Sequence, residues 1–197
     1  MTLPLVLASS SPYRHLLLQR LQLPFVWQSP DIDETPLANE KVQTMTLRLA
    51  TEKARALAAS HPKALIIGSD QACVLEGETA IIGKPGNFEK ARRQLLACSG
   101  RSVSFHTALV LLSSETGACH SSQDVFTVHF RELDDAEICR YLELEQPYDC
   151  AGSFKAEGLG IALFERMEGN DFHSLIGLPL ISLCNLLRIY GLNPLRP

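Results

Sequence analysis

The spacing of apolar residues along the chain predicts an α/β fold. Strand-like apolar runs occur at Leu3–Ala8, Leu65–Gly68 and Val103–Leu112. Between the first two runs, apolar side chains recur on one helical face over Thr44–Ala59, the pattern of an amphipathic helix that covers a sheet. Runs of strand character that alternate with such helices favour a sheet with helices packed against it.

Capping residues predict where several helices begin. Ser11 followed by Pro12 opens a helix that runs to about residue 21, because serine caps free N–H groups and proline fits the first helical position. Asn87 is expected to cap a second helix. Asp134 with Glu137 has the spacing of a capping box.

Three other segments carry definite expectations. Ser69–Gln71 interrupts an apolar run, so we expect a polar break there with an aspartate at the carboxyl end of a strand. The glycine-rich Gly152–Gly169 is expected to form a hairpin, and Leu178–Tyr190 a last helix. No repeat or linker divides the chain, so residues 1–197 are expected to form a single domain.

Composition excludes several classes of protein. The chain has 197 residues, of which 46% are hydrophobic and 20% charged, with a net charge of −4, so a disordered chain is excluded. The apolar runs are too short for a membrane span, and the slight acidity argues against nucleic-acid binding. The start of the chain does not resemble a signal peptide, and six scattered cysteines favour buried reduced thiols. We therefore expect a cytoplasmic protein.

Two segments could bind phosphate. Ser9, Ser11 and Arg14 surround the start of the first helix, where free N–H groups and a guanidinium attract anions; a plain serine cap beside a surface arginine is the ordinary alternative. Lys84 lies between glycine and proline on a stiff turn, which suits a fixed charge but is also common in loops. The spacing is not that of a P-loop.

A basic residue and two acidic residues are further candidates. Lys53 lies at the edge of the apolar face of its helix, where a lysine that extends its ammonium group into solvent is the ordinary alternative. Asp70, at the expected strand end, has a turn aspartate as its alternative. Glu34 belongs to an acidic loop that, with Asp70, could supply the oxygen ligands that Mg²⁺ prefers. The six histidines lack metal-ligand spacing.

Read together, these segments resemble the Maf family of nucleotide pyrophosphatases. The matching motifs span essentially the whole chain and lie at Ser9–Arg14, Arg48–Ala54, Gly68–Asp70, Gly83–Pro85, Ser99–Gly100, Ala151–Phe154 and Gly177–Leu180. The resemblance implies an elongated, inosine-triphosphatase-like mixed sheet with flanking helices and two lobes around a central cleft. It also implies hydrolysis of a nucleoside triphosphate to monophosphate and diphosphate, a divalent cation (Mg, Mn or Co), and a homodimer.

The resemblance also implies roles for individual residues. Asp70 matches the general base of the family. Lys53 and Lys84 match positions that act on the phosphates during catalysis, and Ser9 and Arg14 match further phosphate-handling positions, beside the hydroxyl of Ser11. Glu34 matches an acidic residue near the metal, which Asp70 would also ligate.

Three departures from the commonest family pattern bear on the base that is recognised. Tyr13 replaces an arginine, Gln71 follows the aspartate where threonine is common, and Glu157 replaces a glutamine. These changes resemble the subgroup that acts on 7-methyl-GTP, since a carboxylate can accept hydrogen bonds from guanine and an aromatic ring attracts a cationic base. A dTTP, UTP or broader modified-nucleotide pyrophosphatase is one alternative, and a nucleotide-binding regulator of septum formation is another.

Overall fold

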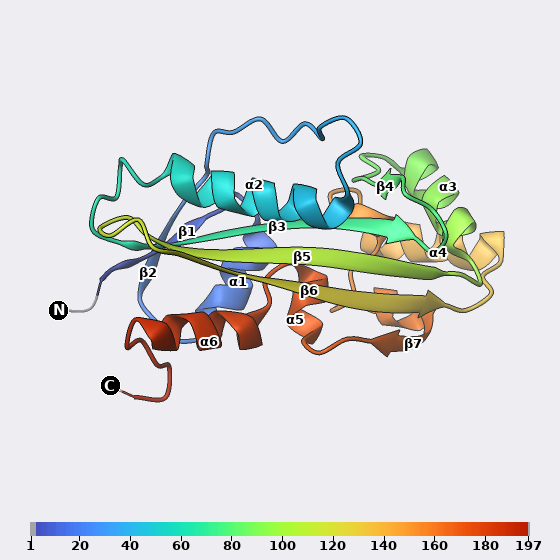
Figure 1. The fold of residues 1–197 in the computed structure, drawn as a ribbon. Coiled ribbons are helices and arrows are strands. Elements are labelled where there is room, and N and C mark those ends of the chain that lie inside the picture. Colours follow the sequence, from blue (N-terminus) through green and yellow to red (C-terminus); the bar gives the residue numbers. More distant parts are fainter. Residues whose placement is uncertain (1–2, 197) are drawn as a thin grey trace. The chain divides into compact units, whose positions relative to one another are not determined.

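The computed structural model describes residues 3–196 and has a mixed α/β fold (Figure 1). Seven strands form one sheet in the order β2-β1-β3-β5-β6-β7, and β4 pairs with β3. The strands are β1 (Leu5–Ala8), β2 (Phe25–Gln28), β3 (Leu65–Leu75), β4 (Ile81–Ile82), β5 (Ser102–Ser113), β6 (Cys119–Phe130) and β7 (Phe164–Glu168). The helices are α1 (Pro12–Gln19), α2 (Val42–Ala56), α3 (Phe88–Cys98), α4 (Asp135–Glu145), α5 (Phe172–Ile176) and α6 (Leu180–Ile189). The predicted α/β class is confirmed.

Parallel and antiparallel pairs occur in the same sheet. β1 pairs in parallel with both β2 and β3, whereas β4 pairs antiparallel with β3 and β7 antiparallel with β6. The chain divides into two compact units. The first comprises the residues up to Gln71, Thr107–Asp124 and the residues from Asp171 on, and the second comprises Ala72–His106 and Val125–Asn170.

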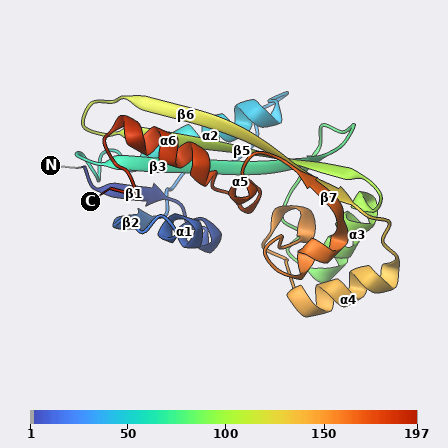
Figure 2. The ribbon, with the colours of Figure 1, turned by 90° about the horizontal axis from the view of Figure 1, so that it is seen from below.

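In the first unit, alternation along the strands buries both faces of the sheet. Leu5 and Leu7 face α1 and α6 with Leu65 and Ile67, whereas Val6 and Ile66 face α2. Figures 1 and 2 show α2 on one face of these strands and α1 and α6 on the other. This packing explains why β1 and Leu65–Ile67 at the start of β3 are apolar at every position.

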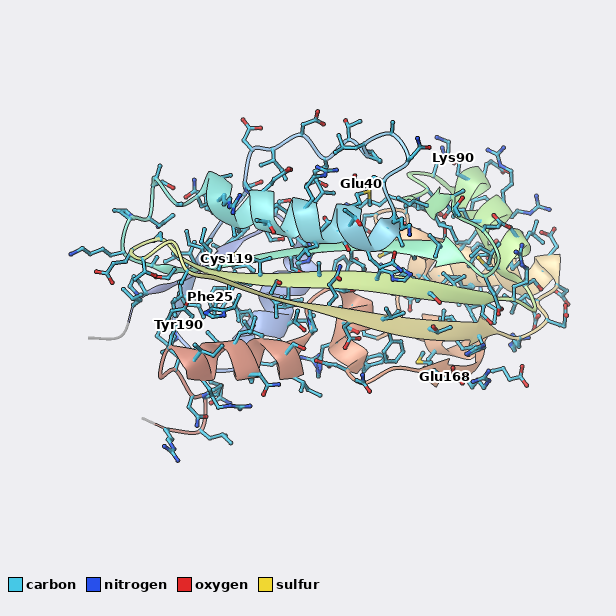
Figure 3. The ribbon with its side chains drawn as sticks, in the orientation of Figure 1. Phe25, Glu40, Lys90, Cys119, Glu168 and Tyr190 are labelled. Carbon is cyan, nitrogen blue, oxygen red and sulfur yellow. The ribbon has the colours of Figure 1, made fainter. Side chains whose placement is uncertain are left out.

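Aromatic rings at the rim of the first core pack beside α6 and α1. Phe25 and Tyr190, both labelled in Figure 3, contact the leucine cluster of this face. In the second unit, a separate aromatic cluster contains Phe105, Phe130, Phe154 and Phe164, in edge-to-face contact. Each unit therefore has a hydrophobic core made from its own side chains.

The predicted helix caps are confirmed. Ser11 accepts a hydrogen bond from the backbone N–H of Arg14, and Asn87 caps α3 in the same way. Asp134 and Glu137 form a capping box at the start of α4. Short polar side chains at these positions satisfy N–H groups that a helix leaves unpaired at its start.

Two predictions of local structure are wrong. The expected break at Ser69–Gln71 is absent, because β3 continues from Leu65 to Leu75 and Asp70 lies within the strand. The Gly152–Gly169 segment is not a hairpin: it forms 3-10 turns at Ala151–Ser153 and Leu159–Leu163, then the single strand β7, which pairs with β6. The expected last helix begins two residues later than predicted, as α6.

The cysteine side chains differ in burial. All six cysteines have free thiols, as expected, but only Cys73 and Cys98 are buried and Cys119 is exposed. Burial raises the pKa of the Cys73 thiol far above its usual range, so this thiol is unreactive. Over residues 3–196, no helix has the length and apolar character needed to cross a membrane.

Candidate active site

Asp70 lies inside β3, on the face that α2 covers. Side chains alternate along a strand, so Ile66, Gly68 and Asp70 point to the same side. Ile66 belongs to the core beneath α2, and Gly68 approaches the backbone of that helix. The Asp70 side chain is consequently directed toward α2, and only 9% of it is exposed.

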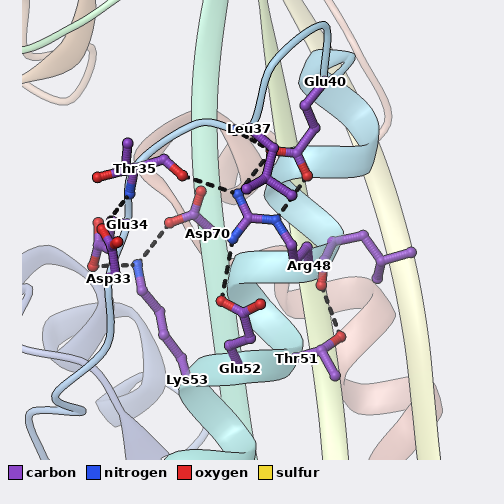
Figure 4. A network of polar contacts seen from close by, with 11 residues as sticks. Asp33, Glu34, Thr35, Leu37, Glu40, Arg48, Thr51, Glu52, Lys53 and Asp70 are labelled. Carbon is purple, nitrogen blue, oxygen red and sulfur yellow. Dashed lines mark hydrogen bonds and ion pairs between the residues drawn. The ribbon is translucent and has the colours of Figure 1, made fainter.

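Lys53 approaches Asp70 from α2. Its neighbours Ala50 and Ala54 pack on the sheet, so Lys53 lies on the sheet-facing side of the helix and is itself buried. Lys53 Nζ donates to Asp70 Oδ1 at 2.7 Å and is 2.9 Å from Glu34 Oε1 (Figure 4). The alternative of a lysine that extends into solvent is therefore wrong: the ammonium group joins two carboxylates.

The approach of α2 to the sheet depends on Gly68. A Cβ atom built there would lie 2.0 Å from the carbonyl oxygen of Ala50 and 3.1 Å from Ala54 Cβ. Any side chain at this position would push the helix away from the strand. The glycine thus sets the distance at which Lys53 meets Asp70.

Arg14 is held beside this pair by the turn between α5 and α6. The capped first turn of α1 carries Arg14, and its Nε donates to the Gly177 carbonyl oxygen at 2.8 Å. The same oxygen lies 3.0 Å from Ser69 Oγ, which is also 2.9 Å from the Ala108 carbonyl oxygen. Because Nε is fixed in this way, the two terminal nitrogens of the guanidinium remain the groups that can bind a ligand.

Ser9 and Ser11 shape the loop before α1. Ser9 is buried, and its Oγ accepts from the Ser11 backbone N–H at 3.1 Å, while Ser11 Oγ accepts from the Arg14 N–H at 3.4 Å. Each hydroxyl acts as an acceptor in these bonds, so its own O–H can still donate. The loop thus combines hydroxyl donors with the start of a helix, an arrangement that attracts anions.

The charges of the cluster influence one another. Burial raises the pKa of the Asp70 carboxyl above its ordinary value, although Lys53 and Arg14 both act to lower it. Burial lowers the pKa of Arg14, while Asp70 and Glu34 act to raise it. A buried carboxylate with a raised pKa is a better proton acceptor than one in water, and such shifts are common at catalytic sites.

Two carboxylates of this cluster suit a divalent cation. Glu34 and Asp70 converge on the same ammonium group, so their oxygens lie close together. Among residues 3–196 no group of three or more histidine, cysteine, aspartate or glutamate side chains could hold a metal ion. Mg²⁺, however, is commonly held by one or two carboxylates together with water and substrate phosphates, so this pair of ligands fits it.

The remaining predicted residues lie at different places. Gln71 follows Asp70 on β3, and its Nε2 donates to Ser174 O at 2.7 Å and to Thr107 Oγ1 at 3.0 Å, so any contact with a ligand falls to its side-chain oxygen. Tyr13 is half-buried in the first turn of α1. Lys84 and Glu157 are exposed residues of the second unit, and their part in the site stays a prediction.

Two residues with roles in the first unit were not singled out from the sequence. The Gly177 carbonyl orients Arg14, and Arg48 contacts the loop that carries Glu34. Both lie in motifs recognised in the sequence, but only contacts between distant segments reveal what they do.

Comparisons with known proteins agree with the resemblance seen in the sequence. The chain matches the family model described as Maf-like protein over residues 4–190. Relatives from Pseudomonas fluorescens strains Pf0-1 and Pf-5 are 61% and 60% identical over 191 residues, which are 97% of this chain and 98% of each relative. A relative from Pseudomonas savastanoi pv. phaseolicola (strain 1448A / Race 6) is 60% identical over 189 residues, which are 96% of this chain and 97% of the relative. All three are named 7-methyl-GTP pyrophosphatase.

The Staphylococcus aureus Ham1 protein aligns with 64% of this chain and 71% of its own, with 16% sequence identity and a TM-score of 0.46.

Proposed function

Because this chain belongs to the Maf family, we propose that it is a nucleotide pyrophosphatase that hydrolyses 7-methyl-GTP to 7-methyl-GMP and diphosphate. The observation that carries the proposal is the cluster in which Lys53 bridges Asp70 and Glu34 beside Arg14. A buried carboxylate next to two fixed cations combines a proton acceptor with binding groups for phosphate. The proposed nucleobase, 7-methylguanine, is taken from the names of the three relatives.

In this proposal Asp70 is the general base. It accepts a proton from a water molecule, whose oxygen forms a bond to the α-phosphorus while the bond from that phosphorus to the bridging oxygen breaks. The electron pair leaves with the diphosphate. Arg14 and Lys53 stabilise the negative charge that grows on the phosphates, as do the hydroxyl groups and N–H groups at the start of α1.

Glu34 and Asp70 would hold a divalent cation, Mg, Mn or Co. When bound, the cation offsets charge on the phosphates and makes water easier to deprotonate. Lys53 contacts both carboxylates, so it keeps them together when the cation is absent. Lys84 is proposed to contact the phosphates as well.

Recognition of the base is assigned to Glu157, Tyr13 and Gln71. The Glu157 carboxylate would accept hydrogen bonds from the N1–H and amino group of guanine, which pyrimidines do not offer as a pair. Methylation at N7 makes the base cationic, and an aromatic ring such as that of Tyr13 attracts a cation by about 0.5–2 kcal/mol. Gln71 directly follows Asp70, the proposed general base, and its amide oxygen is the group proposed to contact the nucleobase.

A panel of triphosphates tests the substrate. The protein is incubated with 7-methyl-GTP, GTP, dTTP or UTP and Mg²⁺ or Mn²⁺, and diphosphate release is measured. We expect the fastest turnover with 7-methyl-GTP. Faster turnover of dTTP or UTP would overturn the choice of base, and binding without hydrolysis of any triphosphate would favour a regulatory nucleotide-binding protein.

Two substitutions test the assigned residues. Asp70→Asn is expected to lower kcat by a factor of about 10² or more. Asp135→Asn, an exposed aspartate paired with Arg92 at the start of α4, is the matched control. Glu157→Gln is expected to slow hydrolysis of 7-methyl-GTP selectively, and an equal loss for every base would show that Glu157 does not contact the base.

A further inference from the structure

We propose that Arg48 is a positioning residue for catalysis, because it fastens the loop between β2 and α2 to the helix and so holds Glu34 against Lys53. This inference rests on the proposed function. Arg48 precedes Lys53 by five residues on α2, and its ion pairs are with Glu40 and Glu52 rather than with Asp70. Its action on the site would therefore pass through the loop.

The Glu40 carboxylate is the point at which loop and helix meet. Arg48 Nε donates to Glu40 Oε1 and Arg48 Nη2 to Glu40 Oε2, each at 2.7 Å. Glu40 Oε2 also accepts from the Leu37 backbone N–H at 3.1 Å, and only 5% of the Glu40 side chain is exposed. The Glu40 carboxylate thus binds both the loop backbone at Leu37 and Arg48 on α2.

A second contact reaches the part of the loop next to Glu34. Arg48 Nη2 lies 3.3 Å from the Thr35 carbonyl oxygen (Figure 4), and the Thr35 N–H donates to Asp33 Oδ1 at 2.9 Å. Both neighbours of Glu34 in the chain are therefore fixed. The Glu34 side chain itself is 59% exposed, and within residues 3–196 the ion pair with Lys53 at 2.9 Å is its one direct polar contact, so its position depends on the backbone of the loop.

The chemistry of this contact requires arginine. The planar guanidinium donates to both oxygens of one carboxylate and still has N–H groups for Thr35 O and for Glu52 Oε2 at 3.2 Å. A lysine ammonium would keep the charge but would not reproduce this two-point geometry. The hydrogen bonds from Arg48 lower the pKa of Glu40, so the pair stays charged at neutral pH.

A double-mutant cycle tests whether Arg48 acts through Glu34. We measure kcat/KM for triphosphate hydrolysis, with the best substrate of the panel, in wild type, Arg48→Gln, Glu34→Gln and the double variant. Arg48→Gln is expected to lower kcat/KM by about tenfold to a hundredfold, the cost of a misplaced catalytic group. In the Glu34→Gln background, Arg48→Gln should lower kcat/KM by less than about threefold, because the effects of residues that act through one another are not additive. Equal losses in both backgrounds would overturn the proposal, since a purely structural defect does not depend on Glu34.

Hydrogen exchange tests the loop without reference to activity. In Arg48→Gln, the amides of residues 33–40 are expected to exchange about tenfold faster, while those of β3 stay unchanged. Unchanged exchange in the loop would overturn the proposal. Arg48→Lys should resemble Arg48→Gln, and full activity in Arg48→Lys would show that charge alone suffices and would also overturn it.

Arg92→Gln is the matched control, since it removes a partly exposed arginine that pairs with Asp135 at 2.6 Å. It should leave both exchange in the loop and kcat/KM as in wild type. The substrate panel on the wild-type protein tests the proposed function separately. If the panel contradicts that function, the hydrogen-exchange result on the loop still holds. If the double-mutant cycle is additive, Arg48 has no positioning role, although the proposed activity still holds.

Discussion

The close contact of Gly68 with α2 makes Gly68→Ala a sharp test of the site. The added Cβ would lie 2.0 Å from the Ala50 carbonyl oxygen, whereas real Cβ contacts essentially never fall below 3.0 Å. The distance must therefore grow by at least 1.0 Å, from 2.0 to 3.0 Å or more. The contacting atom belongs to the helix backbone, so no side-chain rotation relieves the clash and the helix has to move.

The cost follows from the packing. Ala50 and Ala54 are completely buried against the sheet, and overpacking of such an interface typically costs about 1–3 kcal/mol. For a chain of this size, we expect a melting temperature about 4–8 °C lower for a loss of about 2 kcal/mol. The same movement carries Lys53 away from its 2.7 Å contact with Asp70, so kcat/KM should fall as well.

Thermal unfolding followed by circular dichroism measures the stability, and diphosphate release measures kcat/KM. Gly83→Ala is the matched control for stability, because a Cβ there meets nothing within 4 Å and the backbone is not strained. Wild-type stability and activity in Gly68→Ala would refute the reasoning, since they would mean that α2 does not rest on β3 at this spacing.

Three further predictions concern the same cluster. Lys53→Met leaves the buried Asp70 carboxylate without its ion-pair partner and should reduce the free energy of unfolding, measured in urea, by about 3–5 kcal/mol. The Lys53→Met/Asp70→Asn double variant should recover stability, and an equal loss in both variants would contradict the prediction. Gly177 has φ +124°, so Gly177→Ala should lower the free energy of unfolding by about 1–3 kcal/mol, and it should also lower kcat/KM because it displaces Arg14. Gly117→Ala is the control: Gly117 has φ +75° in a distant turn of the first unit, so the substitution should lower stability alone. Burial raises the pKa of Asp70, so at pH values above the ordinary carboxyl value of 3.8 the folded state holds more protons than the unfolded state. With a chelator present, the free energy of unfolding should therefore fall as the pH rises above 3.8. Urea titrations at several pH values measure this slope, which Asp70→Asn should lack.

Local signals in the sequence were sufficient for most elements of the fold. The caps at Ser11, Asn87 and Asp134 were predictable because they depend on hydrogen bonds between residues three positions apart. The amphipathic pattern placed α2 correctly to within a few residues, since burial of one helical face is written into the spacing of apolar side chains. β1 and the start of β3 were equally clear from their apolar runs.

The sequence marks Ser69–Gln71 as a cluster of candidate functional residues, whereas contacts with distant segments explain why the strand continues through them. Ser69, Asp70 and Gln71 look like a break because three adjacent polar side chains are costly inside a sheet. They stay in β3 because partners from other segments satisfy each of them: carbonyl oxygens for Ser69 and Gln71, and the ammonium group of Lys53 for Asp70. Whether a buried polar group is tolerated depends on atoms distant in the sequence, and that information exists only once the chain has folded.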